Sequence, residues 1–254
     1  MAITLYENEI PYNDAAPGGN PQVAEFLTES WYPLPAVIVL PGGAYRNHAA
    51  HEAEPIAEFY KSCGFHAFVL RYRLLPNLYP AALCDVQRLI KYLRANATQL
   101  KVDPDKIFVL GFSAGGHLAA TSAVAEDVCR LGDGLDEQNH RPSGVLLCYP
   151  VVNTGHSCVV NIAGGDAAVC EKLCIDQRIT HDTPPMFIWH TAEDATVSVQ
   201  QSLSLASALR EHKIPFQLHV FPHGSHGLGL ARHLPEISVW AELSAQWIRS
   251  VCNV

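Results

Sequence analysis

Residues 106–120 read KIFVLGFSAGGHLAA, a short apolar run that leads into a glycine-rich turn and then into a run of small residues. The GFSAG at 111–115 fits the pattern G-x-S-x-G between a predicted strand and a predicted helix. Small residues must flank such a serine, because neighbouring chain approaches the sharp turn closely. The turn places the hydroxyl at the carboxyl end of a sheet and at the positive end of a helix, so Ser113 is predicted to be a nucleophile. A glycine-rich phosphate-binding turn with an incidental serine is the alternative.

Outward from this turn, short apolar runs alternate with longer amphipathic segments. Strands are expected over residues 36–40, 65–70, 107–110, 145–149, 186–190 and 216–221. Helices are expected over residues 49–62, 80–100, 115–124, 199–211 and 236–251. Because the strands are continuously apolar, they are expected to be buried on both faces, as in a parallel sheet covered by helices. The order predicts an α/β fold with a mostly parallel, doubly wound sheet.

Three further stretches lie outside this alternation. Residues 1–35 are expected to add an antiparallel edge hairpin, and residues 127–141 and 154–183 are expected to be long irregular insertions. Long loops in compact domains are usually functional or mobile. No repeat, low-complexity tract or linker interrupts the chain, so a single domain over residues 1–254 is expected.

Composition excludes several classes of function. The chain has 254 residues, 48% of them hydrophobic, and a formal net charge of −8, which argues against intrinsic disorder and against nucleic acid or an anionic membrane as partner. The eight cysteines are scattered without a CxxC pair and are expected to be mainly buried thiols. The first ten residues lack a basic n-region and an apolar h-region, so a cytoplasmic location is expected unless a signal has been removed. No metal or other cofactor is expected.

A serine hydroxyl needs a base within hydrogen-bond reach to act as a nucleophile at neutral pH. With 13 histidines in the chain, number alone selects none of them. His226 lies in the glycine-rich segment PHGSHGLGL just after the last predicted strand, at the same sheet edge as Ser113. We therefore predict that His226 is the base. His223, three residues earlier, is its rival, and either could instead be a surface loop histidine.

The base in turn needs a carboxylate that orients it. Asp194, in the segment WHTAEDATV, directly follows the predicted strand 186–190 and so lies at the same edge. Glu193 is adjacent, whereas Asp182 precedes that strand and would fall at the opposite edge. The chain order of nucleophile, acid and base is then the one typical of an α/β-hydrolase sheet.

Backbone N–H groups are expected to stabilise the negative charge that develops on a substrate carbonyl oxygen. The sequence PGGAY at 41–45 follows the first core strand, and its glycines allow N–H groups of Gly43 and Ala44 to face the site. Ala114, directly after the nucleophile, supplies the second donor. A plain tight turn is the alternative interpretation of the PGGAY segment.

With these motifs together, the chain resembles the α/β-hydrolase superfamily along nearly its whole length, and more narrowly the small carbohydrate acetylesterases and acetyl-xylan-esterase-like enzymes related to hormone-sensitive lipase. The matching stretches are VLPGGAY, EAEPIAEFY, YPAALCDVQRLIKYLRANA, VDPDKIFVLGFSAGGHLAA, TPPMFIWHTAEDATV and HGSHGLGLA. The resemblance implies a nucleophile at Ser113, a base at His226, its orienting acid at Asp194, and oxyanion donors at Gly43 and Ala114. Where the lipase branch has His-Gly-Gly-Gly, this chain has PGGA at 41–44.

The resemblance implies a serine esterase acting on acetyl or other short acyl esters of carbohydrates such as xylan, with no large cap domain. Tyr45 and residues 154–183 are expected to wall a small acyl pocket, and His156 is a candidate substrate contact, although a surface loop position is an alternative. An aryl formamidase, a feruloyl-type esterase or peptidase of the same fold, and a catalytically inactive receptor are the competing functions. The expected partner is a small ester or oligosaccharide ester, and a homo-oligomer is possible.

Overall fold

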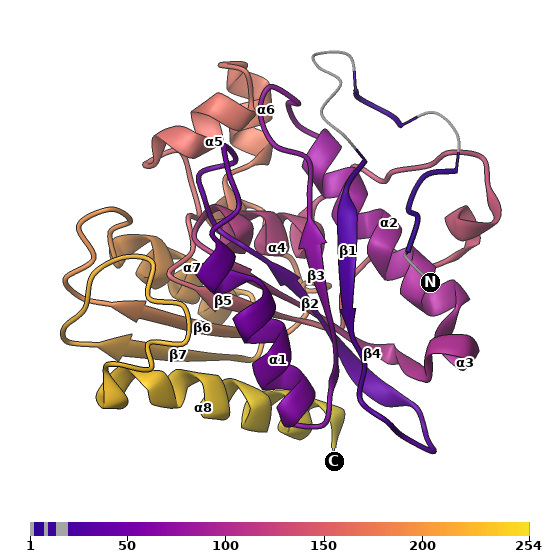
Figure 1. The fold of residues 1–254 in the computed structure, drawn as a ribbon. Coiled ribbons are helices and arrows are strands. Elements are labelled where there is room, and N and C mark those ends of the chain that lie inside the picture. The colour runs from indigo at the N-terminus through magenta and orange to yellow at the C-terminus, as the bar shows by residue number, and fades with distance from the viewer. Residues whose placement is uncertain (1–2, 8–9, 14–19, 254) are drawn as a thin grey trace.

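The computed structural model describes residues 3–7, 10–13 and 20–253. Within these ranges, seven strands form one sheet in the order β1-β3-β2-β4-β5-β6-β7 (Figure 1). The strands are β1 (Gln22–Phe26), β2 (Leu34–Leu40), β3 (His66–Arg71), β4 (Val102–Phe112), β5 (Gly144–Cys148), β6 (Met186–Thr191) and β7 (Phe216–Phe221). Neighbouring strands are parallel except for β1, which runs antiparallel to β3. The predicted mostly parallel sheet is confirmed.

Successive side chains of the central strands enter two different hydrophobic cores. In β2, Ile38 and Leu40 pack into one core cluster, and Val37 and Val39 pack into the other. All four side chains are fully buried. Burial on both faces explains why these strands are continuously apolar rather than alternating.

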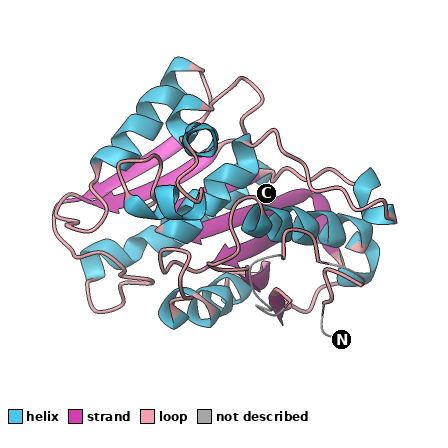
Figure 2. Ribbon diagram, turned by 90° about the horizontal axis from the view of Figure 1, so that it is seen from above, coloured by secondary structure: helices cyan, strands magenta, loops and turns pink. Residues whose placement is uncertain are grey.

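Helices cover both faces of the sheet, as the view from above shows (Figure 2). They are α1 (Glu54–Ser62), α2 (Ala81–Ala95), α3 (Ala97–Leu100), α4 (Ala114–Val124), α5 (Ser157–Ile162), α6 (Ala167–Lys172), α7 (Gln200–Glu211) and α8 (Pro235–Cys252). Apolar residues of α2, α4 and α7 belong to the first core cluster, whereas those of α1 and α8 belong to the second. The sheet is therefore doubly wound, and its parallel strands β2, β4, β5 and β6 present their carboxyl ends at one edge.

Some expected elements differ from the structure. The edge hairpin is wrong for the described residues, because β1 pairs with β3 and not with the next strand β2; residues 1–2, 8–9 and 14–19 of that segment lie outside the described residues. The helix expected over 80–100 breaks at Asn96, whose φ of −106° and ψ of 19° leave the helical region. Residues 154–183 are not irregular throughout, since they contain α5, α6 and a short 3₁₀ turn.

The cysteines of the chain are mostly in the core. All eight cysteines are free, and six are buried, in agreement with the expectation of mainly buried thiols. No helix in the described part of the chain is long and apolar enough to cross a membrane.

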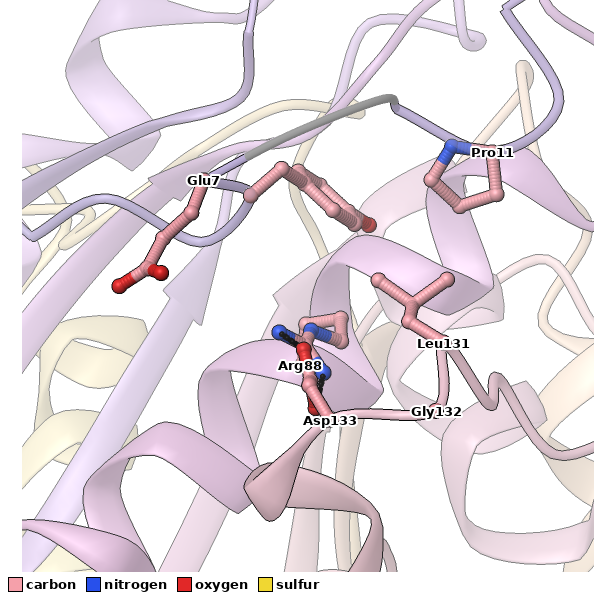
Figure 3. Close-up of a pocket in the computed structure, with 7 residues that line it drawn as sticks. Glu7, Pro11, Arg88, Leu131, Gly132 and Asp133 are labelled. Carbon is pink, nitrogen blue, oxygen red and sulfur yellow. Dashed lines mark hydrogen bonds and ion pairs between the residues drawn. The ribbon is translucent and has the colours of Figure 1, made fainter.

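A cavity of about 380 Å³ lies between the N-terminal segment, α2 and the 127–141 insertion (Figure 3). Its lining residues are Tyr6, Glu7, Pro11, Arg88, Leu131, Gly132 and Asp133. Across its floor, the Arg88 guanidinium forms an ion pair of 2.7 Å with the Asp133 carboxylate. The wall contains none of the predicted site residues, so this cavity is separate from the edge where Ser113 lies.

Candidate active site

Ser113 occupies the turn between β4 and α4 with φ 53° and ψ −116°. Such a positive φ is uncommon for a residue with a side chain and persists only where the surroundings enforce it. Here the Ser113 N–H donates to the Cys148 carbonyl at 3.0 Å, and the Ser113 carbonyl accepts from the N–H groups of His117 and Val151 at 3.0 and 3.2 Å. The next strand and the new helix thus fix the serine in its unusual conformation.

The flanking glycines are needed because backbone approaches them closely. A Cβ atom on Gly111 would lie 2.1 Å from the Gly115 carbonyl oxygen, and one on Gly115 would lie 2.2 Å from the Leu40 carbonyl oxygen. A Cβ atom on Gly42 would lie 3.1 Å from the Ser113 Cβ. The turn after β2 is therefore packed directly against the serine.

His226 joins the serine to a carboxylate. Its Nε2 lies 2.9 Å from the Ser113 Oγ, and its Nδ1 lies 2.6 Å from the Asp194 Oδ2. An ionised carboxylate can only accept, so Nδ1 carries a proton and donates it to Asp194. Nε2 of the neutral ring is then the acceptor for the serine O–H, which is the arrangement a general base requires.

Asp194 is held as an anion by several donors. Its Oδ1 accepts from the N–H groups of Thr196 and Val197 at 2.9 and 2.8 Å, and the buried ring of His190 lies 3.4 Å from its Oδ2. Burial alone would raise the pKa of Asp194, but the hydrogen bonds from His190, His226 and Val197 outweigh it and hold the pKa well below its usual value. The carboxylate therefore stays charged beside His226.

The rival residues lie elsewhere. His223 pairs with Glu193 at 2.8 Å, and both side chains are largely exposed. Asp182 is also exposed and lies 3.3 Å from His181. Of the weighed histidines and acids, the structure brings His226 and Asp194 to Ser113 and leaves His223, Glu193 and Asp182 in other contacts.

The predicted oxyanion donors are backbone N–H groups of the turn after β2 and of the residue after Ser113. The Gly42 N–H donates to the Glu52 carboxylate at 2.8 Å and is therefore not free for a substrate. Gly43 and Ala44 have φ of 128° and 55°, and within the described residues no protein acceptor takes their N–H groups or that of Ala114. These three predicted donors remain available for an oxyanion.

The two predicted substrate contacts occupy different environments. The Tyr45 ring is buried, and its hydroxyl lies 2.7 Å from the His117 Nδ1. His156 is half-buried before α5, where its Nδ1 accepts from the Cys158 N–H at 3.2 Å. Burial lowers the pKa of His156, and the neighbouring His226 lowers it further. Because Nδ1 of His156 accepts, the neutral ring carries its proton on Nε2, which is left as a donor.

Sequence reasoning missed His190, Glu52 and Tyr149. His190 is the second-last residue of β6, four residues before Asp194, and Tyr149 follows β5 at the same edge, so their places in the chain were a usable signal. Glu52 carries no such signal, because its 2% exposure results from tertiary packing. Across residues 3–7, 10–13 and 20–253, no group of three or more His, Cys, Asp or Glu side chains is arranged to hold a metal ion.

Comparisons with known proteins show which family the chain belongs to. Residues 28–147 match the family described as BD-FAE, and residues 174–253 match the prolyl oligopeptidase family. The chain is 36% identical to endo-1,4-beta-xylanase B of Butyrivibrio fibrisolvens over 89% of its length and 27% identical to an acetylxylan esterase of Xylanibacter ruminicola over 85%. It covers only 37% and 45% of these two relatives, less than half of each.

A solved structure is similar over the whole chain. The acetyl ester-xyloside bifunctional hydrolase of Caldicellulosiruptor lactoaceticus superposes with a TM-score of 0.92 at 37% identity, covering 100% of this chain and 97% of that one. The Lactobacillus plantarum carboxylesterase Cest-2923 superposes with a TM-score of 0.79 at 28% identity, covering 94% of each chain. The chain belongs to the α/β-hydrolase superfamily, as these relatives and solved structures show.

Proposed function

We propose that this protein is a serine esterase that removes acetyl and other short acyl groups from carbohydrate esters such as acetylated xylan or xylo-oligosaccharides. The observation that carries the proposal is the hydrogen-bonded series from the Ser113 hydroxyl through His226 to Asp194, at 2.9 and 2.6 Å, beside unpaired N–H groups of the described chain. The carbohydrate part of the proposal is supported by the names of relatives, one an acetylxylan esterase and one an acetyl ester-xyloside hydrolase. We also propose one domain over residues 1–254, because both core clusters share a single sheet.

In the proposed mechanism, the Ser113 Oγ attacks the ester carbonyl carbon while the His226 Nε2 takes the hydroxyl proton. The negative carbonyl oxygen accepts hydrogen bonds from the N–H groups of Ala114 and of Gly43 or Ala44. The carbon–oxygen bond to the alcohol then breaks, and His226 returns the proton to the departing alcohol. Water then attacks the acyl carbon while His226 takes a proton from it. The bond between that carbon and the Ser113 Oγ breaks, His226 returns the proton to Oγ, and the acid leaves.

Asp194 acts through His226 in this scheme. Its carboxylate holds the proton on Nδ1, so that Nε2 faces the serine as an acceptor, and it stabilises the imidazolium that forms during attack. His156 would donate from Nε2 to the alcohol part of the substrate, because its Nδ1 already accepts from Cys158. Tyr45 would act indirectly, by shaping the turn in which Gly43 and Ala44 lie.

The test is hydrolysis of a panel of esters by the wild type and by Ser113→Ala. We expect acetyl and butyryl 4-nitrophenyl esters to react faster than the octanoyl ester, acetylated xylo-oligosaccharides to be deacetylated, and Ser113→Ala to lose at least about a thousandfold in kcat. Far-ultraviolet circular dichroism of Ser113→Ala should match the wild type. Near wild-type activity in this variant would show that Ser113 is not the nucleophile.

Adding N-formyl aromatic amides and feruloyl esters to this panel separates the competing functions. Preference for N-formyl aromatic amides would make the protein a formamidase, and preference for feruloyl esters would make it a feruloyl-type esterase. No hydrolysis together with no labelling of Ser113 by a fluorophosphonate would favour a receptor that has kept the hydrolase fold.

A further inference from the structure

A buried carboxylate lies directly behind the candidate active site. Glu52 is 2% exposed and lies between the turn after β2 and the residue that follows β5. Its Oε2 accepts from the Gly42 N–H at 2.8 Å, and its Oε1 accepts from the Tyr149 hydroxyl at 2.6 Å. A buried charge without such donors would be strongly unfavourable, so both contacts are needed to keep the carboxylate in place.

Tyr149 extends these contacts to the loop that carries the base. Its hydroxyl oxygen accepts from the Gly229 N–H at 3.0 Å, three residues after His226. Its ring meets the His226 ring edge to face, with centroids 4.9 Å apart. The tyrosine is 1% exposed and therefore cannot shift without opening the core. A single side chain thus contacts both the histidine and the loop behind it.

His51, the neighbour of Glu52, contacts the same loop from outside. Its Nε2 donates to the Gly227 carbonyl at 2.8 Å. A Cβ atom on Gly229 would lie 3.0 Å from the His51 carbonyl oxygen, so the two backbones are in close contact. Residues 51 and 52 therefore fix the loop 226–229 at three points: Gly227, Gly229 and, through Tyr149, the ring of His226.

We propose that Glu52 is a positioning residue for catalysis. It fixes the turn after β2, residues 41–45, and the loop 226–229 relative to each other. By taking the Gly42 N–H, it orients the following N–H groups of Gly43 and Ala44 toward the serine. Through Tyr149, the same carboxylate fixes His226. This inference rests on the proposed esterase function, because attack on an ester needs the oxyanion N–H groups and the base His226 in place at the same time.

The first test is a double-mutant cycle of Glu52→Gln and Tyr149→Phe on 4-nitrophenyl acetate. Glutamine keeps the size of Glu52 but has one oxygen, so it cannot accept from Gly42 and Tyr149 through two oxygens. We expect each single variant to lose about tenfold to a hundredfold in kcat with KM changed less than about threefold, since small misplacements of catalytic groups have effects of this size. The double variant should lose no more than the worse single variant.

Tyr60→Phe is the matched control. Tyr60 is also a fully buried tyrosine of the same core cluster, and its hydroxyl bonds the Ser244 Oγ at 2.6 Å, away from the site. Loss of the Tyr60 hydroxyl should leave kcat within about twofold of the wild type. If Glu52→Gln and Tyr149→Phe behave like Tyr60→Phe, or if their losses multiply in the double variant, the proposal is wrong.

A second readout does not depend on activity. The Nδ1 proton of His226, bonded to Asp194, should give a low-field proton resonance in the wild type and in Tyr60→Phe. We expect it to broaden in Tyr149→Phe and in Glu52→Gln as the loop loosens. An unchanged resonance in both would overturn the positioning role even if no ester is hydrolysed, whereas a wild type that hydrolyses none of the esters would reject only the proposed function. If Glu52→Gln does not fold, Tyr149→Phe carries both readouts.

Discussion

The conformation of Ser113 is held by its neighbours rather than by its own preference. A backbone in this sparsely populated region costs about 1–3 kcal/mol, and three backbone hydrogen bonds from adjacent segments offset that cost. Gly115 contributes differently, since it lets the first turn of α4 lie against the end of β2. The hydroxyl position therefore depends on the absence of a methyl group two residues away.

Gly115→Ala should disrupt this arrangement. The new Cβ would lie 2.2 Å from the Leu40 carbonyl oxygen and 2.6 Å from that of Pro41, so backbone would have to move. We expect the free energy of unfolding to fall by about 3 kcal/mol or more, because both contacts are with backbone, and esterase activity to fall with it. Urea unfolding at pH 7 measures the first effect.

Gly134→Ala is the control for that substitution. Nothing lies within 4 Å of its added Cβ, so its stability should change by less than about 1 kcal/mol. Equal stability of the Gly115 and Gly134 variants would show that the close approach at the serine turn can relax.

Helix α4 is buried along its entire length, and it carries one histidine into the core. His117 is fully buried, with its Nδ1 2.7 Å from the Tyr45 hydroxyl and its Nε2 3.0 Å from the Leu173 carbonyl oxygen. These contacts fit a neutral ring that accepts from Tyr45 and donates to Leu173. Burial lowers the pKa of His117 from 6.5 to about 4.

This pKa shift predicts a loss of stability in mild acid. Between about pH 6.5 and 4, the unfolded chain binds a proton at residue 117 that the folded chain does not, so folding is increasingly disfavoured as the pH falls. The contribution should reach about 2 kcal/mol between pH 7 and 5. It should be absent in His117→Gln, which urea unfolding at the two pH values would detect.

His181→Gln serves as the control, because its side chain is 88% exposed. It should keep the pH dependence of the wild type. His140, whose pKa burial also lowers to about 4, contributes to the slope in every variant. If the slope is the same in the wild type and in His117→Gln, the ring is not held neutral by the fold.

Elements with a strong apolar pattern were predictable, and elements made by local polar contacts were not. The strands expected over 36–40, 65–70, 107–110, 145–149 and 186–190 match β2 to β6, because those stretches are buried on both faces and so are apolar throughout. The strand expected over 216–221 matches β7, although its residues are only partly buried or exposed. Helix α6 begins where the Asp166 carboxylate accepts from the N–H groups of Ala168 and Val169, a capping contact in a segment without apolar periodicity. The break at Asn96 likewise follows no change in hydrophobic pattern.

At the scale of the whole molecule, strand direction explains what could be predicted of the site. Parallel strands present their carboxyl ends at one edge, so Ser113, Asp194 and His226 could be placed there together from the sequence. The link between Glu52 and Tyr149 could not, because this hydrogen bond joins residues 97 positions apart that only tertiary packing brings together. Contacts between side chains of distant segments can be identified only from the packed structure, not from the sequence.

Asp85 holds three segments together in the same way, away from the site. This fully buried carboxylate accepts from the Tyr6 hydroxyl at 2.7 Å, from the Arg73 N–H at 2.8 Å and from the Arg73 guanidinium at 2.7 Å. It thereby ties the N-terminal segment and the chain after β3 to α2. Because the Arg73 side chain is 1% exposed, its charge depends on Asp85 for compensation.

Asp85→Asn should therefore lower the free energy of unfolding by about 3–5 kcal/mol, since it leaves a buried guanidinium without a counterion. Glu54→Gln is the comparison, because the Arg71–Glu54 pair is about one-third exposed and should contribute no more than about 1 kcal/mol. Urea unfolding at pH 7 measures both. Should the two variants lose the same small amount, the N-terminal segment is held to α2 by apolar contacts, and the buried ion pair adds no net stability to the fold.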